Sequence, residues 1–194
     1  MEEMLNQTKI IEKLRQKEIS LFTASDFKKI FQIKKENTVY KILERLTKRG
    51  ILKRLTKRKY LFSFLESDDF QIANFLYSPS YISLESALSF YGIITQFPYQ
   101  ITSITPKKTK IIKTLGKEFS YSHIKPDFFF DYEKKEKFLI ALPEKALFDY
   151  LYLCSKGLRS FEKDDFDFKI INKKKFFSIL KKTRQEKLMK LLKL

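Results

Sequence analysis

Two groups of basic residues in the first third of the chain have the types and spacing that contact DNA. Lys41, Arg45 and Lys48 recur at intervals of four and three residues, so on a helix they share one face. The run from Lys57 to Lys59 follows soon afterwards. Lysine and arginine neutralise backbone phosphates, and arginine can also donate two hydrogen bonds to the edge of a guanine. The chemistry expected of these residues is recognition of duplex DNA.

The elements that must position these cations have a recognisable order. Residues 23–31 predict a short helix, and residues 37–49 predict a second one. Two short strands are expected over residues 51–56 and 60–64, with the second basic run in the turn between them. This order predicts a winged helix-turn-helix, in which the second helix enters a major groove and the hairpin holds the flanking backbone.

The second predicted helix has one apolar face and one polar face. Val39, Ile42, Leu43 and Leu46 recur at i, i+3, i+4 and i+7, which is typical of a buried stripe. Asn37 is a preferred N-cap type, and Gly50 suits the position after the last turn. The polar face and the hairpin supply the residues expected at the DNA, namely Asn37, Thr38, Tyr40, Lys41, Arg45, Lys48, Lys57, Arg58 and Lys59.

The net charge of +17 is concentrated at the two ends of the chain. Residues 1–65 hold 17 Lys and Arg against 7 Asp and Glu, residues 66–168 hold 13 against 15, and residues 169–194 hold 10 against 1. A general enrichment in lysine would be spread evenly, so this distribution favours a polyanionic partner. The polar break after residue 65 predicts two domains, at 1–65 and 66–194.

The second domain is predicted to mix helices and strands, which makes the fold class α+β. Helices are expected near residues 69–76, at 81–92 between a Ser83 cap and Gly92, at 143–154 and at 173–194. Strands are expected at 100–105, 110–113, 117–124 and 138–141, and an additional helix at 5–15 completes the first domain. The last helix is basic and amphipathic, with Phe177, Leu180 and Leu188 on its apolar side. It could pack on the domain, add phosphate contacts, or bind an acidic partner or membrane surface.

The residue types that most catalytic and metal sites need are scarce. His123 and Cys154 are the only histidine and cysteine, which excludes a zinc finger and an intramolecular disulfide. We expect His123 to form hydrogen bonds at a strand end and Cys154 to be a small core residue. The four glycines are scattered, so no phosphate-binding loop is expected. A metal-dependent nuclease, which stays open as an alternative, would have to assemble its site from Asp127, Glu133, Lys135 and Glu136. No catalytic residue, cofactor or metal is otherwise expected.

The sequence also predicts where the protein works. No signal-peptide pattern is visible at the N-terminus, and no apolar run approaches the roughly 20 residues of a membrane span. A single cysteine is typical of a reducing compartment. We therefore expect a cytoplasmic protein without a membrane partner.

Four segments of the second domain carry a resemblance to a known family. They are the runs YISLESALSFYGI at 81–93, ITSIT at 101–105, FSYSHI at 119–124 and IALPEKALFD at 140–149. In this succession, which covers residues 80–155, the chain resembles the AbiEi family of antitoxin-type transcriptional regulators from bacterial abortive-infection toxin–antitoxin loci.

The resemblance implies a regulator with two separate tasks. The N-terminal winged helix would bind inverted repeats in its own promoter. The C-terminal domain would counteract an AbiEii-like toxin that resembles nucleotidyltransferases. Glu144, Lys145 and Asp149 then become candidates for an antitoxin surface, with the open alternative that they are the charged start and exposed face of a packing helix. A regulator without a toxin partner, whose second domain senses a ligand, is the other alternative.

Overall fold

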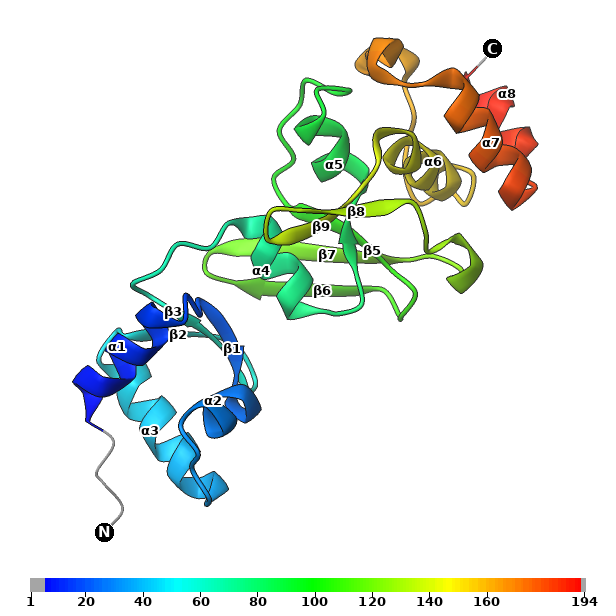
Figure 1. Cartoon of the computed structure of the whole chain (residues 1–194). Coiled ribbons are helices and arrows are strands. Elements are labelled where there is room, and N and C mark those ends of the chain that lie inside the picture. Colours follow the sequence, from blue (N-terminus) through cyan, green and yellow to red (C-terminus); the bar gives the residue numbers. More distant parts are fainter. Residues whose placement is uncertain (1–5, 193–194) are drawn as a thin grey trace. The chain divides into compact units, whose positions relative to one another are not determined.

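The chain folds into two compact units, and each is described by itself (Figure 1). The computed structural model describes residues 6–192. The units are Met1–Asp68 and Asp69–Leu194, so the division falls slightly later than the boundary expected after residue 65. Together they contain one three-stranded and one six-stranded sheet with helices around them, which is an α+β architecture. The predicted helix start at Leu5 and helix end at Leu194 lie outside the described residues.

The first unit packs three helices against a small antiparallel sheet. Its elements are α1 (Gln7–Gln16), β1 (Leu21–Thr23), α2 (Ala24–Ile30), α3 (Glu36–Lys48), β2 (Leu52–Thr56) and β3 (Lys59–Phe62). The strand order is β1-β3-β2. The sequence did not indicate β1, because three residues are too few to show an alternating pattern. Its core is formed by Ile10, Leu14, Phe22, Ala24, Phe27, Val39, Leu43, Leu46, Ile51, Leu52, Tyr60 and Phe62.

Two of the predicted helix ends in this unit are confirmed, and one is wrong. The Thr23 hydroxyl accepts the Asp26 N–H at 3.1 Å, and the Asp26 carboxylate accepts the Thr23 N–H at 2.9 Å, which confirms the predicted start of α2. Gly50 has φ +72°, as its position after α3 requires. The prediction that Asn37 caps α3 is wrong. The helix starts one residue earlier, after Lys35, and Glu36 supplies the carboxylate in its first turn.

The second unit is built on a mixed sheet of six strands in the order β6-β7-β5-β4-β9-β8. Its strands are β4 (Tyr81–Ile82), β5 (Ile101–Thr105), β6 (Lys110–Thr114), β7 (Lys117–His123), β8 (Tyr132–Lys135) and β9 (Phe138–Ala141). Its α-helices are α4 (Asp69–Leu76), α5 (Leu84–Phe90), α6 (Pro143–Cys154), α7 (Lys173–Thr183) and α8 (Met189–Leu192), and short 3-10 turns are η1 (Pro126–Phe128), η2 (Lys163–Asp165), η3 (Phe168–Ile170) and η4 (Glu186–Leu188).

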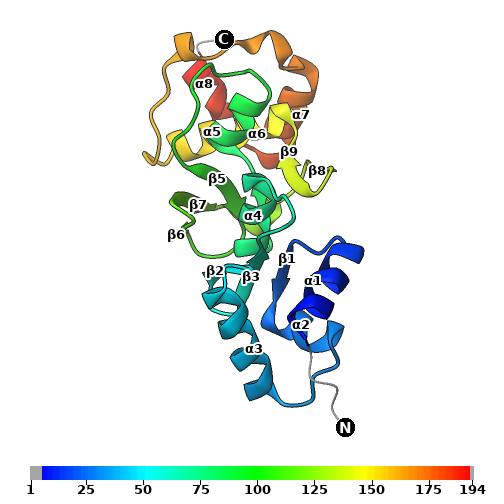
Figure 2. The ribbon, with the colours of Figure 1, turned by 90° about the vertical axis from the view of Figure 1, so that its left-hand side faces the viewer.

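Helices cover both faces of this sheet (Figures 1 and 2), and the hydrogen bonds of two tyrosines show which helix lies on which face. The Tyr121 hydroxyl donates to the Ala73 carbonyl of α4 at 2.7 Å. Tyr81 lies on the opposite face, where its hydroxyl donates to Asp149 of α6 at 3.0 Å. Helix α4 therefore covers one face, while α5 and α6 cover the other and α7 packs on α6.

The second unit differs from the sequence prediction at three elements. The helix expected over 81–92 is a strand, β4, followed by the shorter α5, because Tyr81 and Ile82 pair with β5. Strand β8 was not expected, since all four of its residues are exposed and no alternation marks it. The single C-terminal helix is broken where Arg184 adopts φ +53° at the end of α7. Within α7, Phe177 is exposed, contrary to the prediction, and Phe176 and Ile179 are buried instead.

Candidate nucleic-acid interface

The solvent side of α3 and the β2–β3 turn gather most of the predicted DNA-contacting residues. Val39, Leu43 and Leu46 are buried, which turns the opposite side of α3 outward. Asn37, Thr38, Lys41, Arg45 and Lys48 are all exposed on α3, and Lys57 and Arg58 are exposed in the two-residue turn. Helix α3 packs along β2 (Figure 2). The sequence-predicted cations of helix and hairpin are therefore presented by one small unit.

Glu36 links the turn to the first turn of α3. Its Oε1 accepts a hydrogen bond from the Tyr40 hydroxyl at 3.0 Å and lies 3.7 Å from Nη2 of Arg58. The Arg58 guanidinium also lies 5.9 Å from the centre of the Tyr40 ring. The backbone of Arg58 has φ +65°, a conformation that residues other than glycine rarely adopt. The contacts with Glu36 and Tyr40 offset part of that strain and fix where the turn places its charge.

Three cations of this surface have no partner within residues 6–192. Lys48 is paired with Glu44 at 2.8 Å, and that pair lowers the pKa of the Glu44 carboxyl. Lys41, Arg45 and Lys57 form no ion pair or side-chain hydrogen bond in the same part of the chain. An open concavity of about 600 Å³ separates helix and turn, lined by Tyr40, Glu44, Thr47, Lys48, Arg54, Lys57, Arg58 and Tyr60. Of the three unpaired cations, Lys57 lines this concavity, whereas Lys41 and Arg45 line a second one of about 410 Å³ on α3. All three are available to an anionic ligand.

Lys59 is the predicted contact that the structure places differently. It belongs to β3, is only partly exposed, and pairs in register with Thr23 and Thr56. The residues that sequence reasoning missed are Glu36, which orients Tyr40 and Arg58, and Arg54, which lines the concavity. The spacing of Glu36 and Tyr40, at i and i+4, could have indicated their contact.

The three residues predicted as an antitoxin surface are buried in the second unit, so that prediction is wrong. Lys145 and Asp149 are fully buried and Glu144 is 5% exposed. Glu144 and Lys145 lie in the first turn of α6 and Asp149 lies in its middle, and that helix is covered on one side by the sheet and on another by α7. A charged residue at a helix start looks like a surface residue in the sequence, because the tertiary partners that cover it lie far along the chain.

Lys145, Asp149 and Tyr81 form a closed set of hydrogen bonds. The Lys145 ammonium donates to the Asp149 carboxylate and, at 2.9 Å, to the Tyr81 hydroxyl, which donates in turn to Asp149. The Ser83 hydroxyl donates to the same carboxylate at 2.8 Å. Three rings surround the ammonium, with centres 5.0 to 5.5 Å away, from Tyr81, Phe130 and Phe148.

Burial sets the direction of every pKa in this cluster. It lowers the pKa of the Lys145 ammonium, raises the pKa of the Asp149 carboxyl, and raises the pKa of Tyr81 well above its usual value. Each charge alone would be costly in this position, so lysine and aspartate stabilise each other. The cluster ties β4 to α6 across the sheet, and its side chains contact one another rather than solvent.

Glu144, at the start of the same helix, bonds to the segment before α7 and not to the Lys145 cluster. Its Oε1 accepts the backbone N–H of Asn172 at 2.9 Å. The Asn172 side chain in turn accepts the Lys175 N–H at 3.1 Å and caps α7. Glu144 therefore fixes the start of α7 against α6, and the basic C-terminal segment packs on the unit through Phe176, Ile179 and Leu180.

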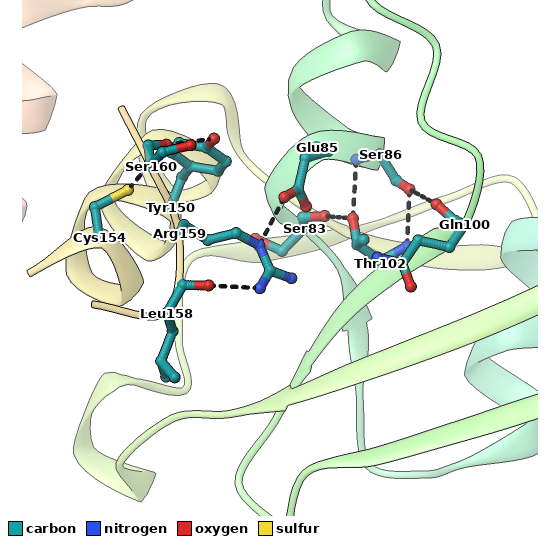
Figure 3. A network of polar contacts seen from close by, with 10 residues as sticks. All are labelled: Ser83, Glu85, Ser86, Gln100, Thr102, Tyr150, Cys154, Leu158, Arg159 and Ser160. Carbon is teal, nitrogen blue, oxygen red and sulfur yellow. Dashed lines mark hydrogen bonds and ion pairs between the residues drawn. The ribbon is translucent and has the colours of Figure 1, made fainter. Parts of the chain in front are cut away.

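A second polar network joins α5 to β5 and to the segment after α6 (Figure 3). The Thr102 hydroxyl donates to the Ser83 carbonyl at 2.8 Å and accepts the Ser86 N–H at 2.9 Å. The guanidinium of Arg159 donates to Glu85 at 2.7 Å. These contacts hold α5 over β5, an inner strand of the sheet, and they give hydrogen-bond partners to Ser83, Ser86 and Thr102.

The two residues considered for catalysis have structural partners. His123 ends β7, and its Nδ1 lies 2.9 Å from the Lys107 carbonyl, as a hydrogen-bonding residue at a strand end should. Cys154 lies in the last turn of α6, with its thiol 3.6 Å from the Ser160 carbonyl. Burial raises the pKa of the Cys154 thiol to about 11.

No metal centre or membrane span is found in the part of the chain that the structure describes. Among residues 6–192, no group of three or more His, Cys, Asp or Glu could hold a metal ion. Of the set considered for a nuclease, Asp127 lies in η1, Glu133 and Lys135 lie on β8, and all are exposed. No helix of the described residues is both long and apolar enough to span a bilayer.

Sequence comparison adds no relative to this description. The chain matches no protein-family model, and no curated protein is significantly similar to it.

Proposed function

We propose that the protein is a DNA-binding transcriptional regulator whose first unit is a winged helix-turn-helix. The observation that carries the proposal is the set of unpaired cations, Lys41 and Arg45 on the exposed side of α3 and Lys57 in the β2–β3 turn. The order of α1, β1, α2, α3, β2 and β3 is the order that such a domain needs.

The proposed docking assigns separate roles to helix and hairpin. Helix α3 enters the major groove, with Arg45 and Lys41 facing base edges and Asn37, Thr38 and Tyr40 beside them. The turn residues Lys57 and Arg58 hold backbone phosphates on the flank. Glu36 contributes indirectly, since it holds Tyr40 and Arg58 in one arrangement before DNA arrives. A surface that needs little rearrangement loses less conformational entropy on binding.

The target that we propose is an inverted repeat in the promoter of the protein's own operon, and the second unit is proposed to act as an antitoxin. Both parts rest on the resemblance of residues 80–155 to the AbiEi family. The toxin would be an AbiEii-like nucleotidyltransferase encoded nearby. The burial of Glu144, Lys145 and Asp149 removes them as the contact surface, so the antitoxin activity is proposed for the unit without a residue assignment.

The DNA-binding proposal is tested by binding to the promoter of the protein's own operon. Arg45→Ala should cost about 1–3 kcal/mol of binding free energy and relax sequence preference at one base pair. Arg58→Ala should weaken binding to all sequences alike, because a phosphate contact carries no base information. A protein that binds neither the promoter nor random duplex DNA would contradict the proposal.

The antitoxin proposal is tested separately by co-expression with the neighbouring toxin gene. Lys41→Ala combined with Arg45→Ala should abolish promoter repression and still rescue growth. Both side chains are exposed, and such changes seldom alter stability by more than about 0.5 kcal/mol. Loss of rescue in this variant, with the fold intact, would show that the two activities are not separable.

A further inference from the structure

The second unit contains a basic concavity that the proposed function does not use. Tyr77, Pro106, Lys107, Lys108, Thr109 and His123 line an open concavity of about 650 Å³. No aspartate or glutamate is among these six residues. Residues 66–168 hold 15 acidic residues against 13 basic ones, so the clustering of lysines here is local. It does not follow from the overall charge of the unit.

The topology of the sheet assembles this concavity from three segments. Strands β5 and β7 are parallel neighbours with Thr105 opposite His123, so both strands end at the same edge. The chain leaves β5 through Pro106 to Thr109 and returns as β6, whose first residue, Lys110, pairs with Tyr121. Tyr77, which follows α4, packs edge-on against Tyr121 with ring centres 5.2 Å apart.

The ammonium groups of two lysines both lie near one aromatic ring. The ammonium of Lys107 lies 5.6 Å from the centre of the Tyr77 ring, and that of Lys110 lies 5.2 Å from it. The Lys107 ammonium also donates to the Ser78 carbonyl at 2.6 Å. None of the lining residues carries a negative charge that could neutralise these ammonium groups, so an anion is the complementary ligand. The ammonium of Lys108, on the rim, has no partner within residues 6–192.

The polar groups of the lining are oriented by their own contacts. The Tyr77 hydroxyl donates to the Lys108 carbonyl at 3.2 Å, and the Thr109 hydroxyl accepts the His123 N–H at 3.1 Å. The Lys107 carbonyl can only accept, so the Nδ1 atom of His123 that faces it carries the proton. These contacts order the loop between β5 and β6, so its lysines are presented from a fixed backbone.

We propose that this concavity binds the sugar-phosphate backbone of a single-stranded nucleic acid. Lys108 and Lys110 supply the cations that contact phosphates, and Lys107 and Tyr77 form the floor of the concavity. Basic grooves that contain aromatic residues are the usual means of holding single strands. A flexible strand can place a phosphate inside a hollow, whereas a duplex is a stiff rod that presents its phosphates on a convex surface. The site lies in the second unit and does not depend on α3.

The test uses the full chain and a labelled single-stranded oligonucleotide of about 12 nucleotides, within the range that small single-strand sites cover. Binding is measured by fluorescence anisotropy over a series of salt concentrations. The variant replaces Lys108→Gln and Lys110→Gln, and leaves Lys107 because it holds the segment that follows α4. The matched control replaces Lys134→Gln and Lys137→Gln, which removes the same charge from exposed positions elsewhere in the unit. Circular dichroism checks that both variants keep the fold.

If two phosphate contacts are lost, the slope of log K against log salt should decrease in magnitude by about 1.4 in the concavity variant and stay unchanged in the control. Equal decreases in both variants, or none in either, would overturn the proposal. An equal decrease for a duplex of the same length would also overturn it, since the site would then not be specific for single strands. Adding Lys41→Ala and Arg45→Ala separates the two proposals, because that change should abolish promoter binding and leave the effect at the concavity intact.

Discussion

Replacing Asp149 by asparagine should destabilise the second unit more than any surface change in it. The amide oxygen of the new side chain could still accept hydrogen bonds from Ser83 and Tyr81, but the buried Lys145 ammonium would lose the carboxylate with which it is paired. Breaking a fully buried ion pair from one side costs about 3–5 kcal/mol of unfolding free energy. That is a large fraction of the stability of a typical domain.

Urea unfolding followed by circular dichroism measures this cost. With a slope of about 1–3 kcal/mol per molar urea, the midpoint should fall by roughly 1–5 M. The control is Lys113→Gln, which breaks an ion pair of 3.0 Å with Glu118 in the same unit, where the lysine side chain is 78% exposed. Solvent already screens that pair, so the midpoint of the control should stay close to that of the unchanged protein.

A double change separates the ion pair from the packing. Lys145→Met combined with Asp149→Asn removes both charges, and it should be less destabilised than Asp149→Asn alone, because no uncompensated ammonium remains buried. A loss below about 1 kcal/mol in Asp149→Asn would refute this reasoning. A double variant in which the two single losses simply add would refute the coupling between the residues.

Three further outcomes follow from named contacts. Arg58→Gly should keep or slightly raise the free energy of unfolding, since glycine tolerates φ +65°, and it should lower the affinity for duplex DNA. Urea unfolding measures the first effect and fluorescence anisotropy the second. A less stable variant would contradict the argument from backbone strain. Glu144→Ala should leave the Asn172 N–H without its acceptor, at a cost of about 1–3 kcal/mol, and hydrogen exchange should increase across α7; unchanged exchange would contradict the anchoring role. Because its pKa is raised to about 11, the half-buried Cys154 thiol should react with a disulfide reagent at pH 8 about tenfold more slowly than after unfolding in urea, since the lower thiolate fraction is partly offset by the greater nucleophilicity of that thiolate. Equal rates would contradict the raised pKa.

The sequence predicted elements best where a local pattern determines them. The start of α2, the glycine after α3, the strands β6 and β7 and the helix α6 all depend on residues close together in the chain. Strands β1 and β4 were missed because pairing with distant strands, and not their own pattern, makes them strands. Strand β8 forms a hairpin with the adjacent β9 and was missed because its four exposed residues show no alternation.

The same division holds for the candidate sites. The exposed cations of α3 could be predicted, since the apolar stripe of Val39, Leu43 and Leu46 determines which side faces solvent. The burial of Lys145 and Asp149 could not, because Tyr81 and Ser83, which satisfy their polar groups, precede them by more than 60 residues. The contact between Arg58 and Glu36 likewise depends on how the hairpin folds back toward α3.

The most direct test of the central claim is the salt dependence of duplex DNA binding. If α3 and the turn neutralise about five phosphates, the slope of log K against log salt should lie near −4 to −5. Lys57→Ala combined with Arg58→Gly should reduce its magnitude by about 1.8, which corresponds to two phosphates. Lys17→Ala combined with Lys53→Ala removes the same charge from exposed positions outside the proposed surface and should leave the slope unchanged. Affinity that does not respond to salt, or equal slopes in the two variants, would contradict the assignment of this surface to DNA.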